Sequence, residues 1–281
     1  MNYRHAFHAG NFADVVKHTI LARVMAHLLK KETAFRVIDT HAGAGIYDLH
    51  GPEALRSPEW RDGIGRVLNA EFDAPSQALL EDYLGAVRTL NPDGALKLYP
   101  GSPALVRAWL RRQDRLIACE LEPGAAQALT RQVGRDKQVK VIAIDGWTGL
   151  SAFIPPKERR GLVLIDPPYE DIDEFSRLAE ALCAAHAKWP TGIFYAWYPL
   201  KTGNDARQLC RTLAPLAGEK SLRVELLVEP VESATGLRGS GQIIINPPWT
   251  LAAELRILLP ALAKILAPGV RNAVSIGPVA A

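Results

Sequence analysis

Cysteine is scarce in this chain, with three residues in 281 that lie far apart and form no CxxC pair. Such a set gives neither a disulfide framework nor a cysteine-based zinc site, so we expect a reducing, cytoplasmic setting and no bound metal. Long hydrophobic runs are also missing. The apolar stretch at residues 257–266 is interrupted by Pro260 and Lys264, and the first residues carry no apolar signal segment. We therefore expect neither a membrane span nor a secretion signal.

A strong excess of charge of either sign is absent too. The 33 Lys and Arg residues against 30 Asp and Glu give a net charge of +3, which allows a nucleic-acid partner without requiring one. Apolar material, by contrast, is plentiful. Hydrophobic residues make up 48% of the chain, enough for the core of one large α/β domain with room for an insert. No heptad seam or long apolar face indicates an obligate dimer, so we expect a monomer.

Hydrophobic periodicity switches repeatedly between the strand and helix repeats, which predicts a doubly wound, mostly parallel sheet. Helices are expected at 12–31, 103–112, 125–133, 175–187 and 204–213, and strands at 35–38, 116–119, 139–144, 162–165, 192–198, 222–228 and 242–245. The last two strands are close in sequence and favour an antiparallel pair at one edge. Residues 46–98 interrupt the rhythm with helical patterns and turns, so we expect an inserted helical subdomain there and a Rossmann-like domain from residues 1–45 and 99–281.

Acids and glycines follow several strands of the predicted sheet, where ligands of open α/β folds bind. Asp39, Glu120 and Asp145-Gly146 end three strands, and Gly43 and Gly45 let the backbone approach a ligand closely. Each signal is weak alone, because capping aspartates are common. The third glycine of the dinucleotide fingerprint is missing, which favours a nucleoside cofactor without phosphate. S-adenosylmethionine fits this set, because its ribose hydroxyls can donate to Glu120 and its adenine amino group to Asp145. Its sulfonium is a cation, which acidic groups favour.

The strongest single motif is Asp166-Pro167-Pro168-Tyr169, directly after the apolar strand at 161–165. Two prolines fix φ and stiffen the turn. The turn can aim the Asp166 carboxylate, the Pro167 carbonyl and the Tyr169 ring at one planar exocyclic amine. This is the pattern of methyltransferases that act on planar amino groups. We assign Asp166 and Pro167 to accept the two amine protons and Tyr169 to stack on the planar ring that carries the amine.

A second copy, Asn246-Pro-Pro-Trp249, follows the last predicted strand. If that strand is antiparallel, its end lies at the opposite edge of the sheet. We therefore interpret this copy as a structural turn.

The N-terminal segment is rich in polar and aromatic residues, and we expect it to lie over the mouth of the site. Tyr3, Arg4 and Lys17 are predicted to contact nucleic acid or cofactor. His5 and His8 lack a third ligand at suitable spacing, so no metal site is predicted. Arg107, Arg111 and Arg115 are spaced to share one helix face, which could bind phosphates or simply face solvent.

These motifs, spread over nearly the whole chain, resemble those of the bacterial 23S ribosomal RNA adenine-N6 methyltransferases of the large subunit, J type. The resemblance is carried by Tyr3-Arg-His-x-Phe-His-Ala-Gly-Asn11, Lys17-His-Thr19, Asp39-Thr-His-Ala-Gly-Ala-Gly45, Tyr99-Pro-Gly-Ser102, Arg159-Arg-Gly161, Ile165-Asp-Pro-Pro-Tyr-Glu170, Trp197-Tyr-Pro199 and Ile245-Asn-Pro-Pro-Trp249.

The resemblance implies a class I methyltransferase fold with an antiparallel edge strand and an inserted helical subdomain. It implies S-adenosylmethionine as cofactor, S-adenosylhomocysteine as product, and an adenine of free or partly assembled 23S ribosomal RNA as substrate. By motif position it assigns cofactor contacts to His18, His41, Ser102, Glu120, Asp145, Gly146 and Asp166, catalysis to Asp166, and an RNA contact to Tyr3. The loop at 236–241 departs from the family pattern, which leaves its substrate contacts open.

Three other functions remain compatible with the residues. A DNA adenine methyltransferase shares the whole site, and a protein-glutamine methyltransferase uses a similar turn, usually with Asn first. A non-catalytic RNA-binding protein with a vestigial pocket is the third alternative, which the intact set of acids and glycines argues against.

Overall fold

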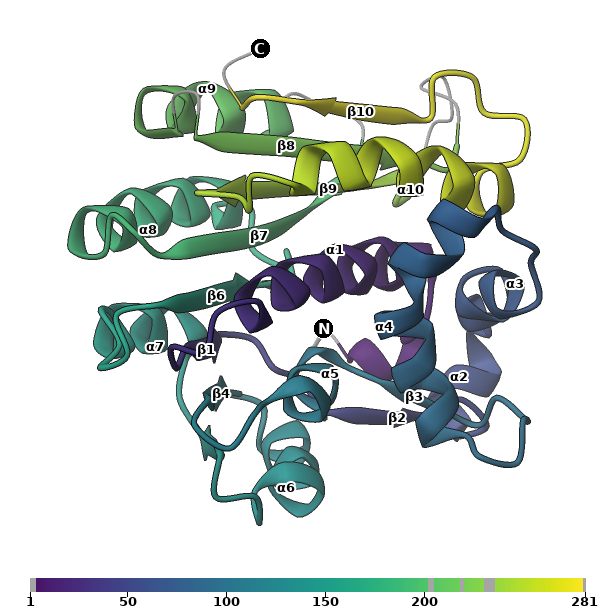
Figure 1. Ribbon diagram of the computed structural model, residues 1–281, viewed down its shortest axis with the longest axis horizontal. Coiled ribbons are helices and arrows are strands. Elements are labelled where there is room, and N and C mark those ends of the chain that lie inside the picture. Colours follow the sequence, from purple (N-terminus) through teal and green to yellow (C-terminus); the bar gives the residue numbers. More distant parts are fainter. Residues whose placement is uncertain (1–3, 202–204, 218–219, 230–235, 280–281) are drawn as a thin grey trace.

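The computed structural model describes residues 4–201, 205–217, 220–229 and 236–279. Its centre is an eight-stranded sheet in the order β10-β8-β9-β7-β6-β1-β4-β5 (Figure 1). The strands are β1 (Arg36–Asp39), β4 (Arg115–Cys119), β5 (Val139–Ile142), β6 (Gly161–Ile165), β7 (Ile193–Leu200), β8 (Ser221–Leu227), β9 (Gly239–Ile245) and β10 (Val274–Gly277). The five neighbouring strands β7, β6, β1, β4 and β5 are parallel. Strand β9 runs antiparallel to both β7 and β8. This is the Rossmann-like sheet of class I methyltransferases, as predicted.

The antiparallel pair is not itself the edge of the sheet. β10, which the sequence did not predict, pairs antiparallel with β8 and covers it. β10 is only four residues long and half exposed, so it carries a weak hydrophobic signal.

Helices cover both faces of the sheet. On one face lie α1 (Phe12–Leu29), α5 (Ser102–Trp109), α6 (Pro123–Val133) and α10 (Leu251–Leu266). On the other lie α7 (Gly146–Phe153), α8 (Glu174–Lys188) and α9 (Asp205–Ala217). Apolar side chains alternate along the strands between these two layers: Val37 and Leu162 face the first, whereas Ile38 and Val163 face the second. This alternation follows the two-residue repeat of a strand.

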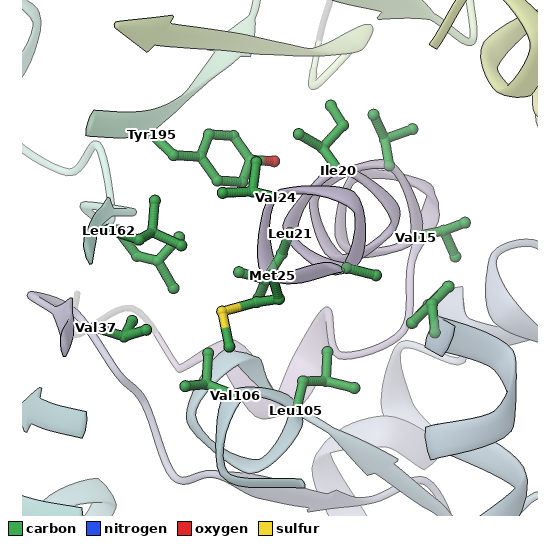
Figure 2. Packing of buried hydrophobic residues seen from close by; sticks show 14 of the residues in the cluster. Val15, Ile20, Leu21, Val24, Met25, Val37, Leu105, Val106, Leu162 and Tyr195 are labelled. Carbon is green, nitrogen blue, oxygen red and sulfur yellow. The ribbon is translucent and has the colours of Figure 1, made fainter. Parts of the chain in front are cut away.

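Helix α1 is the hub of the first layer. Its side chains Val15, Ile20 and Met25 are fully buried and point in different directions, toward the sheet, α5 and the helices beyond (Figure 2). A helix that is apolar around most of its circumference is stable only when neighbours enclose it. The Asn11 side chain caps its first turn by accepting a hydrogen bond from the amide of Asp14 at 3.0 Å. The helix therefore holds its few polar residues in fixed positions.

Residues 46–98 form α2 (Pro52–Arg56), the 3-10 turn η2 (Glu59–Arg61), α3 (Ile64–Leu68) and α4 (Ala74–Leu90). Two short strands missed from the sequence, β2 (Ile46–Asp48) and β3 (Leu98–Pro100), pair antiparallel and bring the ends of the segment together. Helix α4 packs on α1 and α10 through side chains that belong to the same buried cluster. The segment is mainly helical, as expected, and its status as a separate subdomain stays a prediction.

The arginine face predicted at residues 107–115 is wrong. Helix α5 ends at Trp109, and Arg115 already belongs to β4. Arg111 instead pairs with Asp114 and donates to the carbonyl of Lys31 at 2.9 Å, which ties the start of β4 to the end of α1. Among the described residues, no helix is long and apolar enough to cross a membrane.

Candidate active site

Three of the predicted acids meet at one edge of the sheet because β1 lies between β4 and β6. Asp39 is the last residue of β1 and is level with Ala118 of β4 and Leu164 of β6. Glu120 and Asp166 follow those two strands directly. Parallel strands place their carboxyl ends together, so the sheet itself assembles this acidic edge.

The loop after β1 is pinned to Glu120. The amide of Gly43 donates to Glu120 Oε2 at 2.7 Å, and Gly43 and Gly45 have φ values of 64° and 89°. A Cβ at Gly43 would lie 2.2 Å from the Tyr47 hydroxyl, so a larger residue would open the loop. The second Glu120 oxygen accepts from the amide of Glu122 at 2.8 Å. A carboxylate has about four acceptor positions, so Glu120 keeps capacity for two further donors.

Asp39 is almost fully buried at 1% exposure. Its Oδ2 accepts from the Ser102 hydroxyl at 2.7 Å, whereas the buried Oδ1 has no hydrogen-bond partner among the described residues. Burial, aided by the nearby charge of Asp166, raises the pKa of Asp39 to about 7. A buried carboxylate oxygen without a donor is costly, so this position favours a donor or a cation supplied by a ligand.

Asp166 is paired with Lys17 of α1. The Lys17 ammonium donates to Asp166 Oδ2, lies 3.1 Å from Asp14 Oδ1 and sits 5.4 Å from the centre of the Trp197 ring. Burial disfavours the ammonium, but the carboxylates of Asp166 and Asp14 outweigh it and raise the pKa of Lys17 above its usual value. Lys17 is therefore a charged neighbour of the predicted catalytic acid. Its predicted contact with RNA or cofactor stays a prediction.

The turn that follows Asp166 is held in one conformation. Tyr169 has a φ of 53°, uncommon for a residue with a side chain. Its hydroxyl donates to the Trp197 carbonyl at 2.8 Å, and its ring centre lies 4.8 Å from that of Phe175 and 5.6 Å from that of Trp197. Pro167 is buried at the start of the turn. These contacts fix the direction in which Asp166 and the Pro167 carbonyl are presented.

Two predicted cofactor histidines lie beside this edge, His18 buried and His41 half-buried. His18 Nδ1 lies 2.7 Å from the Tyr99 hydroxyl, which in turn lies 2.9 Å from that of Tyr83 in α4. His41 Nδ1 lies 2.8 Å from the Thr40 hydroxyl. Burial lowers the pKa of each histidine to about 4, so both are neutral near pH 7. The part played by Tyr83 was missed because nothing in the sequence shows that α4 reaches the core.

Asp145 and Gly146 lie at the start of α7. Asp145 caps this helix by accepting from the amide of Thr148 at 2.9 Å. Gly146 packs against the loop after β1, because a Cβ there would lie 2.2 Å from the Thr40 carbonyl and 2.7 Å from the His41 ring. The glycine therefore allows His41 and the start of α7 to come together.

The N-terminal residues lie beside this region. Arg4 is exposed and pairs with Glu53 of α2 at 3.2 Å, and His5 Nε2 lies 2.9 Å from Asp14 Oδ2. Tyr3 lies outside the described residues. The RNA contacts predicted for Tyr3 and Arg4 stay predictions. Among the described positions, no cluster of His, Cys, Asp and Glu side chains could hold a metal ion.

The second Pro-Pro turn lies at the other edge, as predicted. β9 runs antiparallel to β7, with Ile245 level with Phe194 near the start of that strand. The Asn246 side chain donates to the carbonyls of Pro190 and Gly192, both at 2.8 Å, and ties β9 to the loop before β7.

Comparison with known proteins agrees with these observations. Residues 32–275 match the sequence profile of the family described as Ribosomal RNA large subunit methyltransferase D, RlmJ. The chain is 38% identical to the Ribosomal RNA large subunit methyltransferase J of Escherichia coli over 268 residues, covering 95% of both chains. It is also 38% identical to the protein of that name from Haemophilus influenzae, over 269 residues and 95% of both chains. The crystal structure of protein LPL1258 from Legionella pneumophila superposes with a TM-score of 0.87 at 37% identity, covering 96% of this chain and 97% of that one. The chain therefore belongs to the RlmJ family of ribosomal RNA large subunit methyltransferases.

Proposed function

We propose that this protein transfers a methyl group from S-adenosylmethionine to the N6 amino group of an adenine in 23S ribosomal RNA. The observation that carries the proposal is the rigid turn Asp166–Tyr169, which lies at the same sheet edge as Asp39 and Glu120. Membership of a ribosomal RNA methyltransferase family supports the substrate class. The amine specificity rests on the chemistry of the turn.

The residues at this edge fit the cofactor. Glu120 has acceptor capacity for the two ribose hydroxyls. Asp145 follows β5, the strand next to β4, and an adenine amino group could donate to its carboxylate at the start of α7. Asp39 Oδ1, which has no hydrogen-bond partner in the described part of the chain, is suited to a cationic group such as the α-ammonium. The neutral rings of His18 and His41 add polar contacts without bringing positive charge near a sulfonium. The Ser102 hydroxyl donates to Asp39 Oδ2 and helps to position this carboxylate.

S-adenosylmethionine, when bound, supplies a methyl group on a positively charged sulfur, which is open to attack by a nucleophile. An adenine N6 is a poor nucleophile because its lone pair is delocalised into the ring. The Asp166 carboxylate and the Pro167 carbonyl can each accept one N6 proton. Two acceptors outside the ring plane favour a pyramidal nitrogen and free its lone pair. Because the acceptors are fixed, positioning supplies a large part of the rate.

Two further groups assist the same step. The Tyr169 ring can stack on the base, and its own hydroxyl is already anchored on the Trp197 carbonyl, so its position is set before substrate arrives. The Lys17 ammonium holds Asp166 Oδ2, which leaves Oδ1 to face the amine. After transfer the nitrogen is acidic, so Asp166 can pass the surplus proton to water without a strong base. An adenine in a loop or single strand is extruded at the lowest cost.

Transfer of tritium from labelled S-adenosylmethionine tests the proposal. Protein-free 23S ribosomal RNA, partly assembled large subunits, genomic DNA and a protein extract are compared as acceptors. The matched control is Asp166→Ala, checked for folding by circular dichroism and for cofactor binding by calorimetry. We expect label in RNA that digests to N6-methyladenosine and that the control lacks. Label only in DNA or in glutamine residues would keep the site chemistry and overturn the substrate. Cofactor binding without transfer to any acceptor would contradict the proposed reaction.

A further inference from the structure

A cavity of about 480 Å³ lies beyond the active site on the same edge of the sheet. It opens between the end of β7, the first turn of α9, and strands β8 and β10, which lie side by side in Figure 1. It is lined by Leu200, Lys201, Ala206, Arg207, Arg223, Glu225, Leu227, Arg238, Asn272, Ala273 and Ser275. None of these residues belongs to the predicted cofactor or catalytic set.

The lining is strongly basic. Among the described residues, the lining includes four cationic side chains and one carboxylate, Glu225. The buried Nε of Arg223 has no hydrogen-bond acceptor among the described residues. Within the described part of the chain, Arg223 Nη1 contacts the weak acceptor Cys210 Sγ, at 4.0 Å. A buried guanidinium nitrogen without an acceptor is costly, and the described lining carries an excess of positive charge, so the cavity favours a bound anion.

The one carboxylate links the cavity to the catalytic turn. Glu225 Oε1 accepts from the Tyr198 hydroxyl at 2.7 Å. The Tyr198 ring lies edge-on to Phe175, with centres 6.5 Å apart, and Phe175 packs on Tyr169 at 4.8 Å. A short row of aromatic rings therefore connects the wall of the cavity to the predicted base-stacking residue.

From this geometry we propose that the cavity binds a backbone phosphate of the RNA strand, next to the target base. This rests on the proposed function. Arginine forks match the two oxygens of a phosphodiester, and Asn272 and Ser275 offer hydrogen bonds to a ribose hydroxyl. Leu200, Leu227 and Ala273 give apolar walls for the sugar. The volume suits a sugar-phosphate group rather than a single small ion. A phosphate held here would fix the strand while the base enters the pocket beside Asp166.

The test uses the full-length protein with the double variant Lys201→Gln/Arg207→Gln and, separately, Arg223→Gln. Lys201 and Arg207 are exposed, so their replacement does not disturb the core. The matched control is Arg256→Gln, an exposed arginine of α10 on the other face of the sheet. For each protein, kcat and KM for methyl transfer to a 23S ribosomal RNA transcript are measured at several salt concentrations. Cofactor affinity is measured by calorimetry.

We expect the cavity variants to raise KM for RNA about tenfold at physiological salt, with kcat and cofactor affinity unchanged. The slope of log(kcat/KM) against log salt should fall by about 0.7 to 0.9, the loss of one phosphate contact. A KM and a slope equal to those of Arg256→Gln would overturn the proposal while leaving the proposed function intact. Absence of transfer to RNA by the unaltered protein would instead show that the proposed function itself is wrong.

Discussion

The molecule contains the same sequence pattern twice, and the two copies have different surroundings. Asp166–Tyr169 follows a parallel strand, so it reaches the edge where Asp39 and Glu120 lie. Asn246–Trp249 follows an antiparallel strand and reaches the opposite edge. Strand direction alone therefore separates a candidate catalytic turn from a structural one.

The side chains of the two turns are also used differently. Asp166 meets a buried ammonium and is 27% exposed, whereas both amide hydrogens of Asn246 are taken up by backbone carbonyls. Tyr169 packs against two rings, while Trp249 is 85% exposed. The backbones differ as well. Positive φ occurs at Tyr169, the last residue of the first turn, but at Asn246, the first residue of the second turn. A Pro-Pro-aromatic motif thus has the chemistry that its neighbours allow.

The largest expected effect separates the two first residues. Asp166→Ala removes an acceptor for the amine and should lower kcat by about 10²- to 10⁴-fold, while the protein stays folded. Asn246→Ala should leave kcat within about threefold, because no reacting group is near it. Initial rates at saturating RNA check both. Retained activity in Asp166→Ala would break the comparison and point to Asn246 as the catalytic residue.

The two aromatic residues should differ next. Tyr169→Ala removes a stacking surface and should lower kcat/KM by about 10- to 100-fold, since base stacking contributes roughly 1–3 kcal/mol. Trp249→Ala should change neither activity nor stability measurably, because the ring is almost free in solvent. Tyr169→Phe keeps the ring and loses only the bond to the Trp197 carbonyl, so it should fall between these limits. Equal losses for Tyr169→Ala and Trp249→Ala would mean that stacking does not occur at Tyr169.

The free energy of unfolding should instead depend on Asn246 in the second turn. Asn246→Ala leaves two carbonyls without their donor and places alanine at a φ of 54°, which should cost about 2 kcal/mol of the free energy of unfolding. Asn246→Gly keeps the backbone conformation accessible and isolates the hydrogen-bond share of that loss. Urea unfolding of both variants measures the two quantities. A loss below about 0.5 kcal/mol in both would remove the structural role from this turn.

The sequence predicted the parallel part of the sheet because its strands are short apolar runs that end in acids or glycines. It also predicted the direction of β9 and thereby the different roles of the two turns. β2, β3 and β10 were missed because they are three or four residues long and lack adjacent Val and Ile residues. The equally short β1 and β5 each contain such a pair. Helix α10 was missed because Pro260 interrupts its helical sequence pattern. In the structure the helix continues through Pro260, with Leu255, Leu258 and Leu262 buried.

The candidate site was predicted less completely than the fold. The acids and glycines at strand ends are visible as local motifs. The pairing of Lys17 with Asp166 joins residues 149 positions apart, and the row from His18 to Tyr83 joins α1 to α4. Such contacts depend on how helices pack across the sheet, which local patterns do not encode. For the same reason the basic cavity, assembled from β7, α9, β8 and β10, has no counterpart in the sequence motifs.

The smallest expected effect is a pH dependence that belongs to the active edge alone. The buried Asp39 has its pKa raised to about 7, so its ionised form increases between pH 6 and 7.5. His18 and His41, with pKa values of about 4, stay neutral over this range. If Asp39 binds a cationic cofactor group, cofactor affinity should rise roughly tenfold over this interval. Folding stability should change in the opposite sense. Asp39 is more easily protonated when folded than unfolded, so its contribution is complete below its unfolded pKa near 3.8 and is lost as pH rises through 7. Calorimetric titrations of the unaltered protein, Asp39→Asn and Asn246→Ala check this. Only Asp39→Asn should lose the pH dependence of binding; its persistence in that variant would place the titrating group elsewhere.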